Sequence, residues 1–305
     1  MSRLQRVIGV AVAALLVCSS AGIAQTAIED VLKAYGEDNA KGYLQPLADL
    51  FGANMQAGYY RTANIPTVGF NIALDFVVMG SLVGDDQKTF DAKTPAGFTP
   101  ATFKAPTLFG DPKGATVTNQ TPGPSFGQPY YASGGIVNTS MFPLLVPQLT
   151  VGSVFGTELI VRYVFIPKLG EDKIPESDLW GIGVRHNVGQ WFSGLPVDIA
   201  AGFFYGSFTS GDLIDYKGTQ FGAQVSKDFS LVTVYGGLAI ESSTMKIKYV
   251  STDPAAGGTV EFDMDGANTF RLTGGACLKL GFFRLFGDVN VGQVFHLSGG
   301  FGFAI

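Results

Sequence analysis

The chain has 305 residues, a net charge of -5 and 15% charged residues, against about 25% in typical soluble domains. The negative balance excludes the basic footprint of nucleic-acid binding. Beyond the N-terminal segment, no run reaches the roughly 18 apolar residues that a spanning helix needs. A closed β-barrel is the other structure that satisfies backbone groups in lipid.

Residues 1–24 have the features of a secretory signal peptide. Arg3 and Arg6 precede a short apolar stretch, and small residues come directly before Gln25. We therefore expect the mature chain to start at Gln25. A retained membrane anchor and a lipid anchor at Cys18 are the alternatives.

Removal of the signal peptide would leave Cys277 as the only cysteine. This excludes an intramolecular disulfide and a cysteine-based metal site.

Residues 25–66 look unlike the rest of the chain and are predicted to form a helical or plug segment. Residues 27–35 favour a short helix, and residues 43–51 favour a second helical turn or two with Pro46 near its start. Residues 54–60 fit either a strand or a segment that crosses the lumen.

Alternating apolar and polar residues then predict a β-barrel over residues 67–305. Residues 81–145 are rich in Gly, Pro, Thr and Asp, and we expect a long external loop there, either free or folded inward. The ten predicted strands are residues 68–79, 149–154, 157–166, 179–188, 197–208, 220–227, 231–250, 260–280, 283–291 and 295–305.

The hairpin at 231–280 changes register along its first arm. Apolar residues occupy even positions up to Ile240 and odd positions from Met245 onward. This shift predicts a β-bulge between residues 241 and 244. Both arms exceed the roughly 9–11 residues of a membrane strand, so we expect them to project beyond the bilayer.

The strand count assigns the two ends of the barrel. An even number of strands places both chain ends on one side, which is the periplasm in bacterial barrels. Counting residues 54–60 and 132–140 as strands would give twelve. With ten, the external loops are 81–145, 168–178, 209–218, 251–258 and 292–294, and the periplasmic turns are 155–156, 189–196, 228–230 and Gly281.

The last strand, residues 295–305, places aromatic and aliphatic residues on one face and small or polar residues on the other. Charged residues of the other strands also lie opposite the apolar face, as the energetic penalty for charge in lipid requires. A secreted β-sandwich shows the same one-sided pattern. The expected lumen-facing residues are Asp75, Glu158, Arg162, Arg185, Asp198, Arg271, Lys279, Arg284, Asp288 and His296.

Little in the chain indicates catalysis or metal binding. His296 and Ser298 match the His-x-Ser spacing of outer-membrane lipid hydrolases, but both should point into the lumen, away from lipid. His186 lies on the apolar face of its strand and is expected at an interface. We therefore expect no enzyme, no cofactor and no metal site.

Several segments resemble an uncharacterised family of bacterial outer-membrane barrel proteins. They are the signal peptide, the last strand, Leu179 to Asn187, Tyr43 to Ala48 and Phe51 to Met55. More distantly, the chain is similar to barrels that transport fatty acids and aromatic hydrocarbons, in which an N-terminal plug fills the lumen. This chain is shorter and ends in Ile305, where many barrels end in Phe.

We therefore predict an all-β, transmembrane, antiparallel up-and-down barrel of 10–14 strands in the bacterial outer membrane, with a short, partly helical N-terminal segment. It is expected to be a channel or transporter for a small hydrophobic solute. Expected partners are outer-membrane lipid, that solute and the barrel-assembly machinery, which would bind the C-terminal strand. The alternative is a structural or interaction protein that works through its external loops.

Overall fold

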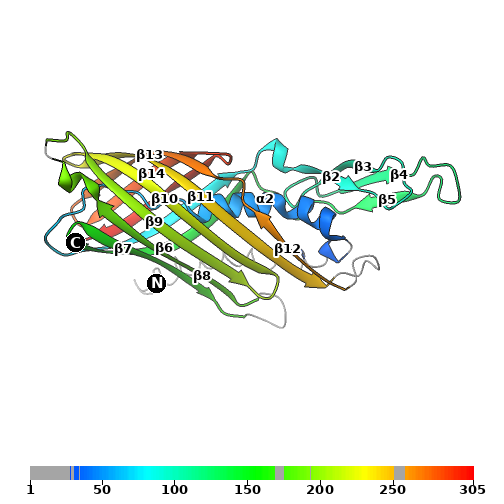
Figure 1. The fold of residues 1–305 in the computed structure, drawn as a ribbon, viewed down its shortest axis with the longest axis horizontal. Helices are drawn as coiled ribbons and strands as arrows, with labels where there is room; N and C mark the ends of the chain where they lie inside the picture. The colour runs from blue at the N-terminus through cyan, green and yellow to red at the C-terminus, as the bar shows by residue number, and fades with distance from the viewer. Residues whose placement is uncertain (1–27, 29–30, 34, 169–174, 193, 251–257) are drawn as a thin grey trace, which may run out of the picture.

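The fold is a closed antiparallel barrel with a helix inside it (Figure 1). The computed structural model describes residues 28, 31–33, 35–168, 175–192, 194–250 and 258–305. The predicted signal peptide and the loop at 251–257 lie outside these residues, as does part of the predicted helix at 27–35. Among the described helices, none combines the length and the apolar character needed to cross a membrane.

Ten strands form the barrel in up-and-down order, as predicted. Each pairs with its neighbours in sequence among these ten, and β15 pairs with β1 to close the ring. The strands are β1 (Asn71–Leu82), β6 (Met141–Val154), β7 (Thr157–Ile166), β8 (Ser177–Asn187), β9 (Asp198–Ser210), β10 (Ile214–Phe229), β11 (Val232–Val250), β13 (Phe270–Leu280), β14 (Phe283–Val291) and β15 (His296–Ala304).

Tight turns join the strands at one end, which we call the turn end. Phe155 and Gly156 connect β6 to β7 with φ angles of 51° and 72°. Positive φ at both central residues is the geometry of a two-residue hairpin turn that matches the strand twist. The chain after β8 contains a short 3₁₀ helix, η2 (Val188–Trp191), at the same end. The opposite end is the long-loop end.

Two strands start six or more residues earlier than the sequence predicts. β6 begins at Met141 instead of residue 149, and β10 begins at Ile214 instead of residue 220. Pro143 and Pro147 mask the first, because proline is rare inside strands. At the start of β10, Asp215 and Lys217 replace the apolar residues expected on the outer face, so the alternation is lost.

The predicted bulge in β11 is wrong. β11 pairs with β10 without interruption from Ile247 to Val232, and its odd-numbered residues face inward throughout. What changes is the side chains: apolar residues face outward up to Ile240 and inward from Met245. The irregularity lies in the other arm, at residues 266–269 between β12 (Thr259–Asp265) and β13.

Residues 84–140 form a lobe that projects from the long-loop end (Figure 1). It is more ordered than the loop predicted for 81–145, and it extends outward instead of folding into the lumen. Small alanine side chains and Phe90 and Phe103 build its core. Its elements are η1 (Asp85–Gln87), β2 (Thr89–Lys93), β3 (Thr102–Pro106), β4 (Ala115–Thr118) and β5 (Pro129–Ala132).

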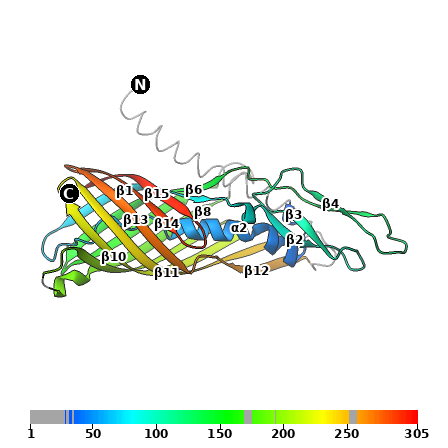
Figure 2. The same ribbon diagram turned by 90° about the horizontal axis from the view of Figure 1, so that it is seen from above.

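Helix α2 (Glu37–Met55) enters the barrel from the long-loop end and runs toward the turn end (Figures 1 and 2). It is longer than predicted, and Pro46 lies inside it instead of near its start. A proline ring inside a helix meets the carbonyl group four residues earlier. For Pro46 that residue is Gly42. After the helix, residues 56–65 continue inside the barrel, and the chain then turns into β1.

Candidate functional site

The N-terminal segment fills the lumen, and the two halves of the lumen differ in chemistry. We call the half around residues 44–51 of α2 the upper lumen; it lies toward the long-loop end. The half around residues 56–65 is the lower lumen; it lies toward the turn end.

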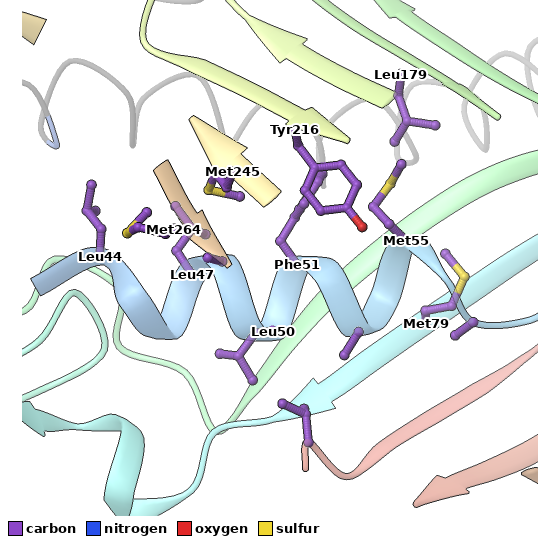
Figure 3. Close-up of a cluster of buried hydrophobic side chains, with 14 of the residues drawn as sticks. Leu44, Leu47, Leu50, Phe51, Met55, Met79, Leu179, Tyr216, Met245 and Met264 are labelled. Atoms are coloured by element: carbon purple, nitrogen blue, oxygen red, sulfur yellow. The ribbon is translucent and has the colours of Figure 1, made fainter. Parts of the chain in front are cut away.

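Apolar side chains fill the upper lumen (Figure 3). One side of α2 packs against inward-facing residues of β11 and β12. In this part of the hairpin the apolar side chains point inward instead of outward. Burial of this kind contributes roughly 1.5–3 kcal/mol for each large side chain. The contributing residues include Leu44, Leu47, Phe51 and Met55 of α2 and Met79, Leu179, Tyr216, Met245 and Met264 of the wall.

Arg271 binds the last turns of α2. Its Nη2 donates to the carbonyl oxygen of Ala53 at 2.9 Å and to Glu241 Oε2 at 3.0 Å. Its Nη1 lies against His296 Nε2. The carbonyl end of a helix carries partial negative charge, so a buried cation there is favourable, and Glu241 neutralises it.

Arg162 binds the residues that end the helix. It donates to the carbonyl oxygens of Met55 at 3.1 Å and Ala57 at 2.7 Å. Gln148 Oε1 accepts from its Nε at 3.0 Å, and the guanidinium lies 3.6 Å from the ring centre of Tyr59. Because β7 supplies the arginine, the wall itself satisfies the free carbonyl groups at the helix end.

Arg185 holds the chain further on. Its Nη1 donates to the carbonyl oxygen of Thr62 at 3.2 Å and to Gln224 Oε1 at 2.5 Å, and its Nε donates to Glu158 Oε1 at 2.7 Å. Three wall arginines thus bind successive backbone carbonyls of the N-terminal segment, from Ala53 to Thr62.

A fourth arginine group lies near the turn end. Arg284 forms two hydrogen bonds of 2.7 Å with the two oxygens of Asp75. Arg61, from the N-terminal segment, places its Nε 3.5 Å from Asp75 Oδ2 and its guanidinium 3.3 Å from the ring centre of Phe286.

The structure places every predicted lumen residue on the inner side of the wall. Asp198, Lys279 and Arg284 are partly buried, and Lys279 Nζ lies 2.9 Å from Asp228 Oδ1. The fully buried members are Asp75, Glu158, Arg162, Arg185, Arg271, Asp288 and His296.

Sequence reasoning missed Glu241, Gln148, Gln224 and Arg61. Glu241 lay in the expected bulge, and Arg61 lies in a segment without periodicity. Continuing the alternation of β11 without a bulge would have placed Glu241 on the inner face, whereas no local pattern marks Arg61.

Asp49 of α2 lies above the polar network. Its Oδ1 accepts from Gln45 Nε2 at 2.8 Å and from the backbone N–H of Ala267 at 3.0 Å. Burial raises the pKa of the Asp49 carboxyl above its ordinary value, although these two hydrogen bonds oppose the shift.

The outer surface of the barrel carries a continuous apolar band. Exposed aromatic residues mark its two edges, and the outward-facing side chains between them are mostly apolar. Lys227 of β10 faces outward beside Phe229 at the turn edge. At the long-loop edge these are Tyr163, Phe165, Trp180, Phe270 and Phe295, and at the turn edge Phe70, Phe155, Trp191, Phe192, Phe229 and Phe282.

The outer face of the long hairpin changes abruptly above this band. Ile240 of β11 is 62% exposed, and further along the same face are Lys246 and Lys248 of β11 and Glu261 and Asp263 of β12, all exposed. The apolar surface therefore ends near residue 241, where the apolar residues move to the inner face.

The ladder between β6 and β7 is incomplete. It has six residue pairs and ends at Gln148 and Arg162, although β6 extends to Met141 and β7 to Ile166. By comparison, β6 pairs with β1 through twelve residue pairs. We call residues 141–147 of β6 and 163–166 of β7 the seam.

Two prolines explain the seam. Successive residues of a strand direct their backbone groups to opposite neighbours. Val83 N–H donates to the carbonyl oxygen of Ser140 at 3.0 Å, so even-numbered residues of this strand face β1. Pro143 and Pro147 are odd-numbered and face β7, where each lacks the N–H that a ladder requires.

Apolar side chains lie behind the seam. Val146 is buried on the inner face of β6, and Phe142, Leu144 and Val164 are partly buried. They pack against the cluster that fills the upper lumen. The seam therefore lies between the outer apolar band and the apolar half of the lumen.

The histidines take part in separate contacts. Ser298 donates to Asp288 Oδ1, whereas His296 contacts Arg271, so the His-x-Ser pair shares no hydrogen bond within the described structure. His186 lies at the turn end, with Nδ1 2.8 Å from Thr157 Oγ1 and its ring 4.9 Å from that of Trp191. Among the described residues, no cluster of His, Cys, Asp or Glu could hold a metal ion.

The sequence matches, over residues 1–305, a family model described as "Family of unknown function (DUF6588)". The chain belongs to this family. The predicted membership of an uncharacterised family is thus confirmed, while the more distant similarity to fatty-acid and hydrocarbon transporters stays a prediction. A comparison with curated proteins found no match.

Similar solved structures include the Salmonella typhi OmpF complex with daunomycin, at 9% identity and a TM-score of 0.25, over 77% of this chain and 97% of that chain. A mutant of the Rh. blastica porin shows 13% identity and a TM-score of 0.16, over 78% and 99%. A BenF-like porin from Pseudomonas fluorescens Pf-5 shows 10% and 0.17, over 77% and 98%.

Proposed function

We propose that this protein is an outer-membrane channel for a small hydrophobic solute, closed in the described state by its own N-terminal segment. The solute would enter from the membrane through the seam. The observation that carries this proposal is the incomplete β6–β7 ladder, which lies between the outer apolar band and the apolar upper lumen.

The outer surface supports the location in a membrane. An outward apolar band between two aromatic edges is the typical surface of outer-membrane barrels. Charged side chains appear on the outer face of the long hairpin where the apolar band ends, as expected where a strand passes from the bilayer into water. The C-terminal strand β15 completes this band and would be the segment that the barrel-assembly machinery binds.

The N-terminal segment supports a gated channel instead of an open pore. Ten strands enclose little space, and the cavity bordered by Gln56, Tyr60 and Arg271 measures only about 10 Å³, about the volume one water molecule needs. Passage therefore requires α2 to move. A hydrophobic solute could replace the apolar contacts that α2 loses in the upper lumen.

Restoring the missing backbone donors tests the seam. The double variant Pro143→Val, Pro147→Val should extend the β6–β7 ladder and close the seam. We expect uptake of a hydrophobic fluorescent dye by intact cells to fall, while the boiled and unboiled proteins still differ in gel mobility. Pro122→Val, in the exposed part of the lobe, is the matched control. Unchanged dye uptake in the double variant would contradict the proposal.

A second candidate function rests on the lobe. Residues 84–140 form an ordered projection with exposed Phe126 and Tyr131, which fits the alternative of an interaction protein. Deleting residues 112–133 distinguishes the two. Full dye uptake with loss of partner binding would favour the lobe, whereas loss of dye uptake in the seam double variant with partner binding intact would favour the channel.

A further inference from the structure

A second cavity lies at the turn end of the lumen, far from the seam. It measures about 90 Å³, several times the roughly 10–15 Å³ that one water molecule needs. Arg61, Arg284 and Lys279 border it together with Thr62, Cys277 and Phe282. Its volume suits a small group and not a large solute.

The cavity wall carries excess positive charge. Asp75 lies between Arg61 and Arg284 and balances one of them. Asp228 pairs with Lys279 at 2.9 Å. Of the residues that line the cavity, Arg61, Arg284 and Lys279 are charged and none is acidic.

Arg61 has unused hydrogen-bonding capacity. Its side chain is 3% exposed, yet neither its Nε nor its Nη2 has a hydrogen-bond partner within the described structure. Only its Nη1 donates, to the carbonyl oxygen of Tyr60 at 2.5 Å. A buried guanidinium normally has its donors satisfied, and an unpaired buried donor costs about 1–3 kcal/mol.

We propose that this cavity is a binding site for a small oxyanion, a carboxylate or a phosphate. Its negative charge matches the cations that line the cavity, and its oxygens would accept from the guanidinium of Arg61, whose Nη2 is unpaired within the described structure. The site lies between the N-terminal segment and the wall, so a bound anion would strengthen the contact of residue 61 with β14. The proposal does not depend on solute passage through the seam.

Isothermal titration of the purified full-length protein with acetate, and separately with inorganic phosphate, tests the site. We expect saturable binding of at least one of them, weakened about tenfold in Arg61→Gln, as loss of a charge-assisted pair implies. Lys41→Gln, which removes a partly exposed cation on α2, should bind as the wild type does. Which of the two anions binds identifies the source of the ligand.

Cys277 gives a readout without any variant. It borders the cavity and is the only cysteine among the described residues. The bound anion should slow its reaction with a small neutral thiol reagent, while chloride at equal ionic strength should not. Equal rates with and without acetate and phosphate, or undiminished binding in Arg61→Gln, would overturn the proposal.

Discussion

The upper and lower halves of the lumen hold the same N-terminal segment by different physics. In the upper lumen, α2 packs through leucine, methionine and aromatic side chains. In the lower lumen, Arg162, Arg185 and Arg271 bind backbone carbonyls at defined distances. Apolar packing has no preferred direction, whereas hydrogen bonds weaken steeply when their geometry changes.

This difference assigns separate roles to the two halves. The lower lumen fixes the register of the segment, because each arginine recognises a particular carbonyl. The upper lumen tolerates sliding and exchange of contacts, and it is the half that the seam reaches. Opening is therefore expected to begin with the upper turns of α2 while residues 56–65 stay bound.

Breaking the polar half should have the largest effect. Arg271→Met leaves Glu241 buried without its cation, which costs about 3–5 kcal/mol. We expect the midpoint temperature of the heat-dependent gel shift to fall strongly. The double variant Arg271→Met, Glu241→Gln removes the isolated charge and should recover part of the loss. No difference between the single and double variants would mean that Glu241 is not buried beside Arg271.

The apolar half should respond to volume. Leu50 is fully buried on α2, and Leu50→Ala should destabilise the plugged state by about 2–4 kcal/mol through the cavity it leaves. Leu50→Met conserves volume and should cost less than ~1.5 kcal/mol. Denaturant unfolding in lipid vesicles measures both. Equal losses for the two variants would contradict the assignment of this half to apolar packing.

The comparison extends to the outer face of the same wall. Ile182 points outward between the aromatic edges and is 44% exposed. Ile182→Arg should lower the free energy of unfolding in lipid by about 2–3 kcal/mol. Ser242→Arg, on the outer face above the band, should change it by less than ~1 kcal/mol. Two equal effects would show that the apolar band does not end near residue 241.

Asp49 should give the smallest effect and a pH signature. Its pKa is raised in the folded state by burial, so its contribution to stability is present below the unfolded value of about 3.9 and is lost as pH rises through the folded value. Asp49→Asn keeps the Oδ1 acceptor and should stabilise the docked helix at neutral pH, removing this pH dependence. Thermal gel-shift midpoints between pH 4 and pH 7 measure it, and a wild-type-like pH profile in the variant would contradict the role of Asp49.

The barrel was predictable because membrane strands repeat a simple pattern. The predicted strands at 157–166 and 283–291 coincide with β7 and β14, since both alternate without interruption. The inner positions of the arginines followed from the same alternation. Their partners did not, because the carbonyls of residues 53–62 belong to a segment whose path depends on tertiary contacts. The move of the apolar residues of β11 from the outer to the inner face was also not predicted. In the sequence, such a change of environment looks the same as a change of register.

A reversible lock on α2 tests the central claim that the N-terminal segment closes the channel. A Cβ built on Gly52 would lie 3.7 Å from Ser243 Cβ, within the roughly 3.5–4.5 Å of a disulfide. The variant Gly52→Cys, Ser243→Cys, with Cys277→Ser, should lose dye uptake by cells when oxidised and regain it on reduction. The two single-cysteine variants should be insensitive to oxidation. Equal uptake by the oxidised and reduced double variant, with the disulfide verified by mass spectrometry, would contradict the account.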